Sequence, residues 1–386
     1  MKRHSLFIGI AISALFLYLA FRRTNLSEVW SHLASARYIY LLPASLLTLL
    51  AFWIRAIRWG RLLSPLRSIS PGALFSATMI GFMCNNVLPM RLGEFVRAFV
   101  IGRSSGVRPA AAFATIVIER LFDLFSMIGI FGAILVFYPF HNRVFKAGVL
   151  IAFVFGLAVL AFLVVLRLKG DALLGWARGI SLRPGDRAAR WIPASLRDRL
   201  LGALAKLHDR LLRALTSFRA GLEIFSDVRL LLVVGVLTLS MWLCFVFVIK
   251  FCFQAARLEE VASLPPMASL VVMVVMAIGI MVPSGPGFVG TLQAAAVLGL
   301  SMVGYGDQGR ALGFSILYHA TQWFPIVLVG LIYLMKEQLS LSQVGRISGE
   351  KVLGEERADP EGAPVTRDAT PEGQGAGQGG NDSGGP

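Results

Sequence analysis

Apolar runs long enough to cross a lipid bilayer recur along most of this 386-residue sequence. A transmembrane helix needs about 20 mostly apolar residues, and the clearest runs occupy 6–21, 38–54, 110–137, 147–166, 230–253 and 311–335. The chain is 56% hydrophobic and only 15% charged, which excludes a soluble globular protein. The sequence therefore predicts an all-α polytopic membrane protein with about six full spans.

The net charge of +15 lies mostly in the loops and predicts how the chain is oriented. Short cytoplasmic loops of membrane proteins are enriched in Lys and Arg, so the N-terminus and residues 55–70, 103–108 and 167–229 are expected in the cytoplasm. Arg55, Arg58 and Arg61 would then emerge from a helix end at anionic lipid headgroups. No nucleic-acid motif accompanies this charge, so nucleic acid is not an expected partner.

This charge pattern predicts a hairpin that enters and leaves the membrane on one side. If residues 55–70 and 103–108 are both cytoplasmic, residues 72–101 between them must enter the membrane and return. They are expected to form a re-entrant hairpin that bends at the polar stretch 85–89. Irregular backbone at that depth is tolerated only inside protein or against a wet cavity.

A second re-entrant hairpin is expected in the C-terminal half. If the acidic turn at 257–260 is outside and the tail is inside, residues 267–303 must enter and return, with a bend at 283–287. Span, hairpin and span would then occur twice, in opposite directions, at 38–137 and 229–335. Broken elements at matching positions of inverted halves are typical of transporters, whose sites lie where the breaks meet.

Residues 167–229 form the largest polar segment before the tail, with 13 Lys or Arg against 6 Asp or Glu. Leucines and phenylalanines from Leu200 to Phe225 recur every three or four residues, which predicts a basic amphipathic helix on the inner leaflet or against another helix. The last stretch is too rich in Gly, Glu, Asp and Pro to bury a core. The expected division is a transmembrane domain at 1–344 and a disordered cytoplasmic tail at 345–386.

The first bend concentrates polar and charged groups that are costly to place in lipid. They are Asn85, Asn86, Pro89, Arg91, Gly93, Glu94 and Arg97. On a helix beginning near Pro89, Glu94 lies three residues from an arginine on either side, so these groups can pair on one face. The N–H groups at the helix start would also suit an anion. Two interpretations stay open: an internally paired structural knot, or a cradle for a phosphate-bearing headgroup.

The next span carries a compact charged group. Glu119 and Asp123 are four residues apart, so two carboxylates share a helix face, with Arg120 beside them. Because the connection to the first hairpin is short, they are expected either to pair with the hairpin arginines or to contact an ion or substrate directly.

The second bend consists of residues with small side chains or none. The run from Pro283 to Gly287 suits close helix approach or contact between backbone and ligand. Gln293 follows as an uncharged hydrogen-bonding group. In the last span, His319 is either a proton carrier or a hydrogen-bonded packing residue.

Three stretches, Asn85 to Arg97, Glu119 to Asp123 and Pro283 to Gln293, resemble the membrane region of lysylphosphatidylglycerol synthases, a flippase-like family of bacterial inner-membrane proteins. The resemblance covers roughly residues 5–340 and implies a role in moving a lipid, or a lipid-linked headgroup, between leaflets. Family members often carry glutamate where Gln293 stands. The full-length synthases also add a soluble aminoacyltransferase domain, so transfer of lysine to phosphatidylglycerol is not expected from this chain.

The resulting hypothesis is a lipid translocase of the bacterial inner membrane with both termini in the cytoplasm. A charged headgroup would enter a polar cavity between the two bends while the acyl chains stay in lipid. Arg91, Arg97 and Arg120 are expected to contact an anionic group. Glu94, Glu119 and Asp123 are expected to orient those arginines or to contact a cationic group. Asn85, Asn86 and Gln293 are expected to form hydrogen bonds with the headgroup.

The expected partners are membrane lipids, either anionic phospholipids or polyprenyl-linked lipids, with a second copy of the chain or a lipid-modifying enzyme as further candidates. The sequence has no metal, nucleotide or redox motif, so no cofactor is expected and no enzyme is recognised. Two alternatives remain. One is an integral-membrane enzyme acting on lipid-linked sugars, although the external loops lack a paired-aspartate motif. The other is a non-transporting scaffold that uses the basic helix within 167–229.

Overall fold

The computed structural model describes residues 3–21, 25–88, 92–137, 227–282 and 284–345, with scattered positions between 143 and 169. The basic amphipathic helix within 167–229 and the tail after Gly345 lie outside these residues, and the expected span at 147–166 is described only in part. So do three of the candidate site residues, Pro89, Arg91 and Pro283.

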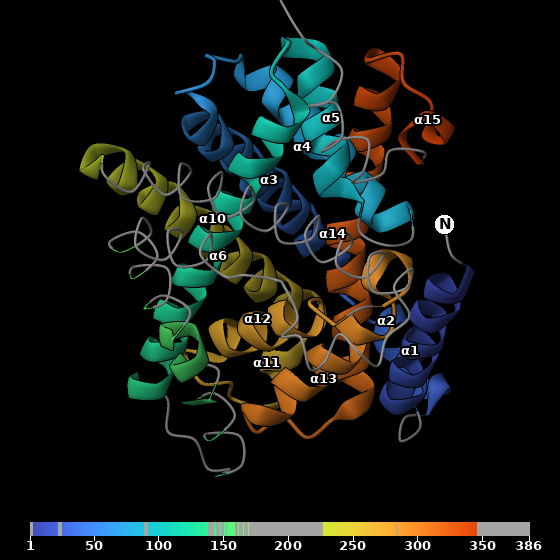
Figure 1. Cartoon of the computed structure of the whole chain (residues 1–386). Helices are drawn as coiled ribbons and strands as arrows, with labels where there is room; N and C mark the ends of the chain where they lie inside the picture. Colours follow the sequence, from blue (N-terminus) through green and yellow to red (C-terminus); the bar gives the residue numbers. More distant parts are fainter. Residues whose placement is uncertain are drawn as a thin grey trace, which may run out of the picture.

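Every secondary-structure element in the described ranges is a helix (Figure 1). The α-helices are α1 (Arg3–Phe21), α2 (Leu26–Ala34), α3 (Leu41–Leu63), α4 (Pro71–Val87), α5 (Gly93–Ser105), α6 (Pro109–Phe137), α10 (Val228–Ala255), α11 (Leu258–Val261), α12 (Ala268–Gly279), α13 (Thr291–Met302), α14 (Gln308–Lys336) and α15 (Leu341–Gly345). Two 3₁₀ turns, η1 (Tyr38–Tyr40) and η3 (Pro286–Phe288), precede α3 and α13. The expectation of an all-α fold is confirmed for the described part of the chain.

Local sequence signals set several helix boundaries. The Ser70 hydroxyl accepts from the Ala73 N–H before α4, whose first residue is Pro71. The Asp227 carboxylate caps α10 and that of Asp307 caps α14 in the same way. Such side chains satisfy N–H groups that the helix itself leaves without partners. At its C-terminal end, α5 is followed by Gly106, which adopts the left-handed conformation with φ 63°.

Among the residues that the structure describes, four helices are long and apolar enough to cross a membrane: Tyr38–Leu63, Pro109–Phe137, Val228–Ala255 and Gln308–Lys336. They coincide with four of the apolar runs expected from the sequence. The first is longer than expected, because α3 continues past 54 to Leu63. Arg55 and Arg58 therefore lie inside a helix instead of at an emerging end.

Between these long helices lie two pairs of short helices, α4 with α5 and α12 with α13, each pair packed side by side. Glycines allow the close approach within both pairs. A Cβ on Gly93 would lie 2.6 Å from the Asn85 Oδ1, and one on Gly279 would clash with the Ala295 Cβ. The two predicted helical hairpins are therefore present. Their re-entry into the membrane from one side stays a prediction.

The helix contacts repeat between the two halves of the chain. Helix α3 packs on α4 as α10 packs on α12, and α5 packs on α6 as α13 packs on α14. The cross-contacts match as well, because α4 packs on α14 and α12 packs on α6. At the centre, α3 and α10 pack on each other. Exchanging the halves thus reproduces the same set of contacts, which is the pattern of an internal two-fold repeat.

The halves run in opposite directions. Along the α3–α10 interface, Leu62 clusters with Val234, whereas Ala51 clusters with Met241 and Cys244, so the two helices are antiparallel. If the two-fold axis ran along the membrane normal, the equivalent helices α3 and α10 would run in the same direction. The antiparallel pairing instead agrees with the inverted repeat expected from the charge pattern.

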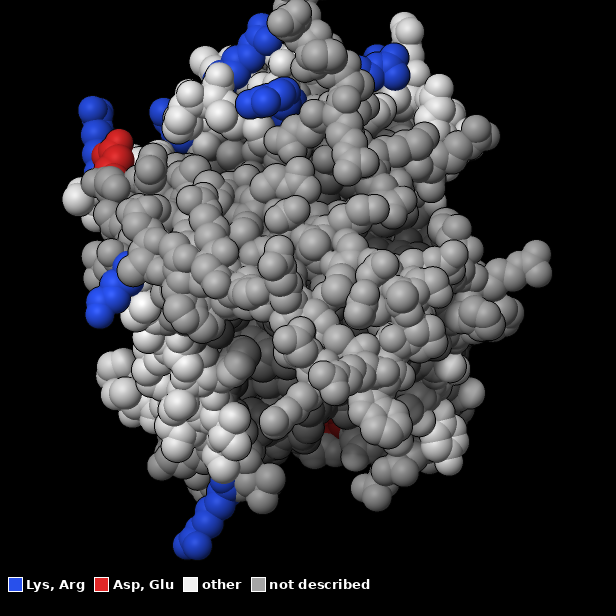
Figure 2. Space-filling view, in the orientation of Figure 1, with Lys and Arg blue, Asp and Glu red and all other residues white. Residues whose placement is uncertain are grey.

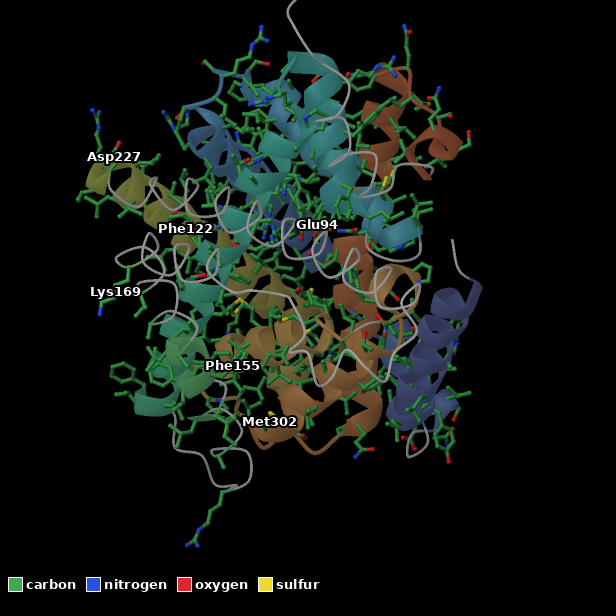
Figure 3. The ribbon with its side chains drawn as sticks, viewed as in Figure 1. Glu94, Phe122, Phe155, Lys169, Asp227 and Met302 are labelled. Carbon is green, nitrogen blue, oxygen red and sulfur yellow. The ribbon has the colours of Figure 1, made fainter. Side chains whose placement is uncertain are left out.

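The two ends of the bundle differ in charge. Arg67 donates to the Ser105 carbonyl, which brings the loops after α3 and after α5 together at one end. Figure 2 shows Lys and Arg side chains along the top of the view, the end to which α4, α5 and α15 extend in Figure 1. At the opposite end three basic residues pair with acids: Arg37 with Glu260, Lys250 with Glu259 and Arg310 with Asp307. Figure 2 also shows one basic side chain projecting from the bottom of the view. In Figure 3, Asp227 lies toward the first end and Met302 toward the second.

Candidate functional site

A cluster of buried charges lies where α3, α5 and α6 meet. Helix geometry places its members on common faces, because residues three or four apart project from the same side. Arg55 and Arg58 of α3 face Glu119 and Asp123 of α6, and Arg97 reaches Glu119 from α5. Glu119 comes ten residues after Pro109, so it lies roughly 15 Å along α6 from its start. The charges are therefore well inside the bundle.

Glu119 lies at the centre of this cluster and is fully buried. Its Oε1 lies 2.9 Å from Arg55 Nη1 and 2.8 Å from Arg120 Nη2, and its Oε2 lies 3.0 Å from Arg97 Nη2. Arg58 approaches Oε1 at 3.3 Å. One carboxylate thus pairs with four guanidiniums. Unpaired, any of these charges would be very costly to bury.

Asp123 forms the second carboxylate of the cluster. Its Oδ1 lies 2.7 Å from Arg58 Nη1, and its Oδ2 lies 3.2 Å from Arg55 Nη1 and 3.3 Å from Arg120 Nη1. Its side chain is 14% exposed and that of Arg120 is 40% exposed, whereas Arg58 is fully buried. Arg120 and Asp123 are therefore the side on which the cluster is open.

Aromatic and hydroxyl groups fix the arginines in place. The Arg97 guanidinium lies 4.2 Å over the Trp59 ring, and the Trp59 indole N–H donates to Thr115 Oγ1. Arg58 Nη1 donates to Thr238 Oγ1 of α10, at 2.8 Å. The cluster is therefore tied to the opposite half of the repeat as well as to its own half.

At the first bend, Asn85 acts within the hairpin. Its Oδ1 accepts from the Gly93 N–H at 2.8 Å, so α4 caps the start of α5 across the bend. The expectation that a helix would begin near Pro89 was wrong, because α5 begins at Gly93, where the first N–H is already bonded to Asn85. Anion binding at this bend stays a prediction. Half-buried Glu94 occupies the first turn of α5, near the centre of the molecule in Figure 3.

At the second bend, Gln293 and His319 form a hydrogen-bonded pair. The Gly290 N–H donates to Gln293 Oε1 at 2.7 Å, so that oxygen must be the acceptor and the Gln293 Nε2 must be a donor. Nε2 lies 3.0 Å from His319 Nδ1, which therefore accepts. The neutral imidazole then carries its proton on Nε2. This nitrogen is buried and makes no hydrogen bond of normal geometry within the described residues.

The two bends meet. Helix α4 packs on η3, and a Cβ built on Gly287 would lie 3.3 Å from the Asn86 carbonyl oxygen and 3.5 Å from the Trp323 ring. Gly287 has φ 70°, a conformation that residues with a Cβ rarely adopt. The glycine therefore permits the close approach at this point. Ser13 of α1 accepts from the Gly285 N–H and ties a further helix to the bend.

The structure divides the candidate residues into two neighbouring groups. The charge cluster contains Arg97, Glu119, Arg120 and Asp123, and the meeting of the bends contains Asn85, Asn86, Gly93, Gly287, Gln293 and His319. The expected pairing of Glu119 with a hairpin arginine is confirmed at Arg97. No three His, Cys, Asp or Glu side chains within the described ranges come together as a metal site.

Sequence reasoning missed Arg55 and Arg58. They were expected at anionic headgroups, but their side chains are 7% and 0% exposed and pair with Glu119 and Asp123. Arg61, one turn further, is exposed as expected. One signal was available: two carboxylates sharing a face inside an apolar helix need cationic partners, and arginines three residues apart on another helix can supply them.

Comparison with known proteins gives the family. The model of the lysylphosphatidylglycerol synthase transmembrane region matches residues 6–330. A UPF0104 membrane protein of Methanothermobacter thermautotrophicus is 25% identical over 287 residues, which are 72% of this chain and 79% of that protein. The glycosyltransferase AglD of Haloferax volcanii is 30% identical over 136 residues, or 35% of this chain. That match spans only 22% of the glycosyltransferase. Because the family model covers most of its length, the chain belongs to the lysylphosphatidylglycerol synthase transmembrane-region family.

Proposed function

We propose that the protein moves a lipid, or a lipid-linked headgroup, between the leaflets of a bacterial inner membrane. The observation that carries this proposal is the meeting of two interrupted helical hairpins from oppositely directed halves, at Asn86 and Gly287. In transporters built from inverted repeats, such breaks are where the substrate binds.

The polar groups near the bends would take the headgroup. Arg120 and Asp123 are the open side of the charge cluster, so a headgroup would reach the buried arginines past them. Asn86 would offer hydrogen bonds where the bends meet, beside His319, whose ring also interacts with the Gly287 backbone. Binding at fixed, partly desolvated groups lowers the barrier that a charged headgroup meets in hydrocarbon. Translocation would proceed down a gradient of the lipid or be driven by another gradient.

An apolar cavity would suit the acyl part of the same molecule. It has a volume of about 320 Å³ and lies among α1, α6, α12 and α13, with Phe16, Phe131 and Ala295 in its wall. Thr291 also lines it, and its hydroxyl lies 3.3 Å from Ser284 Oγ at the second bend. An acyl chain in this cavity would have its polar end beside the bend.

Reconstitution into vesicles tests the proposal. Fluorescent anionic, zwitterionic and polyprenyl-linked lipids would be placed in one leaflet, and their appearance in the other followed over time. We expect exchange above that of empty vesicles for at least one class, and an Arg91→Ala/Glu94→Ala variant should slow it at least tenfold. Absence of exchange with every lipid, or full exchange by the variant, would contradict the proposal.

A second candidate function is modification of a lipid-linked sugar, because one relative is named a glycosyltransferase. The shared segment is a minor part of that protein, so the name applies to the whole relative. The same vesicles distinguish the two functions. A covalently changed lipid-linked sugar formed without leaflet exchange would favour the enzyme.

A further inference from the structure

The charge cluster has too few hydrogen-bond acceptors for its donors. Each guanidinium carries five N–H groups, whereas each carboxylate has two oxygens. Four arginines converge on the two carboxylates Glu119 and Asp123. The shortage is clearest at Glu119 Oε1, which lies within 3.4 Å of nitrogens from all four arginines. One oxygen does not have enough lone pairs for four such bonds.

The excess donors are buried. The Nε atoms of Arg55, Arg58, Arg97 and Arg120 and the Nη2 of Arg58 are shielded from solvent and make no hydrogen bond of normal geometry within the described residues. Among these side chains, Arg58 is 0% exposed and Arg97 is 1% exposed. Buried donors without acceptors are rare in proteins and destabilising, and in the case of charged groups strongly so.

The cluster also carries excess positive charge. Four guanidiniums face two carboxylates, and Glu94 is a third acid, which attracts Arg120. Within the described part of the chain, one positive charge is therefore left without a counter-charge. A single negative charge with several acceptor oxygens would satisfy both deficits.

From this we propose that the phosphate of a phosphodiester binds the cluster, with Arg55 and Arg58 as ligands beside Arg97 and Arg120. A phosphodiester carries one negative charge, and guanidiniums bind phosphate oxygens in paired hydrogen bonds. The anion would enter past Arg120, the partly exposed member. The proposal rests on the proposed function for the source of that phosphodiester, a membrane lipid. A lipid phosphodiester and inorganic phosphate both present phosphate oxyanions to the arginines.

Ligand-dependent thermal stability of the purified full-length protein tests this site. Inorganic phosphate would be titrated against sodium chloride at equal ionic strength, and mixed micelles with phosphatidylglycerol would be compared with micelles containing diacylglycerol. A ligand that binds only the folded state raises Tm with its concentration. We expect phosphate and phosphatidylglycerol, but not chloride or diacylglycerol, to raise Tm.

Arg120→Gln is the test variant, because the Arg120 side chain is the most exposed of the four and its replacement leaves the pairs of the three buried arginines in place. Arg61→Gln is the control, since Arg61 is an exposed arginine on α3 outside the cluster. Losing a charge-assisted bond should weaken apparent affinity about tenfold or more in Arg120→Gln, and Arg61→Gln should bind like the wild type.

The outcomes separate this site from the proposed function. Phosphate binding that weakens in Arg120→Gln, found without leaflet exchange, supports the site and contradicts the translocase. A Tm rise with phosphatidylglycerol but not with inorganic phosphate supports the site and identifies a lipid as its source. Leaflet exchange in a protein whose Tm responds equally to chloride and phosphate overturns the site and leaves the translocase standing. An unchanged response in Arg120→Gln also overturns it.

Discussion

At the scale of single residues, Glu119 holds the cluster together. It is fully buried and is the one carboxylate that approaches all four arginines of α3, α5 and α6 within the described residues. Arg97 depends on it most, because its described ion pair is with Glu119 alone. Removing this acceptor would leave like charges facing one another in a low-dielectric interior, where repulsion is least screened.

Glu119→Gln should therefore destabilise the protein strongly. Loss of one partner from a buried ion pair typically costs about 3–5 kcal/mol, and an amide keeps the size of the side chain but not its charge. Thermal unfolding in detergent would measure the effect. The control is Glu28→Gln, a change at an exposed glutamate of α2. Equal stability of the two variants would show that the cluster does not stabilise the fold.

Local sequence predicts some partners of Glu119 but not others. Glu119 and Asp123 could be placed on one face from their spacing, and Arg97 could be named as a partner because it is close in the chain. Arg55 lies 64 residues before Glu119. An arginine near the end of an apolar run has the same local pattern whether it meets lipid headgroups or a carboxylate on another helix. Only tertiary packing distinguishes the two.

At the scale of elements, each short hairpin depends on close contact between its two helices. Gly81 and Gly93 face each other in the first hairpin, so that a Cβ on Gly93 would clash with the Gly81 carbonyl oxygen. Gly279 has the corresponding place in the second hairpin, against Ala295. Small residues let helices approach without the hydrophobic driving force that is absent in lipid.

Gly93→Ala should accordingly destabilise the first hairpin by about 1–3 kcal/mol, the usual cost of overpacking. Gly235→Ala is the matched control, because Gly235 lies in α10 and a Cβ there meets nothing within 4 Å. Alanine is the better helix former by up to about 1 kcal/mol, so the control should be neutral or stabilising. Denaturation of both variants in one detergent would measure the difference. A Gly93→Ala protein as stable as the control would mean that the hairpin can open without loss.

The existence of both hairpins could be predicted from sequence, but the start of α5 could not. Asn, Pro and Gly mark an interruption, and basic loops on both sides imply a return. The helix start was expected near Pro89 because proline favours the first turn. It lies at Gly93 because the cap comes from Asn85 across the bend, a contact between two helices that no local pattern encodes.

At the scale of the whole molecule, the repeat of contacts between halves is the organising feature. Charge counting predicted two blocks of opposite direction, and the antiparallel packing of α3 on α10 agrees. The meeting of the two bends was predicted, but the individual contacts at the centre could not be. The contact of Gly287 with Asn86 and Trp323 depends on the left-handed backbone of one glycine and on the packing of α4 against both η3 and α14.

The central claim is that a lipid headgroup passes where the two bends meet, and blocking that point tests it most directly. Asn86→Cys would be labelled with a bulky maleimide after reconstitution, with Ser68→Cys, an exposed loop position, as the control. The three native cysteines are buried, which limits background labelling. Leaflet exchange would be measured before and after labelling of each variant. We predict that labelling abolishes exchange at Asn86→Cys and leaves it intact at Ser68→Cys. Unchanged exchange after complete labelling at Asn86→Cys would contradict the account.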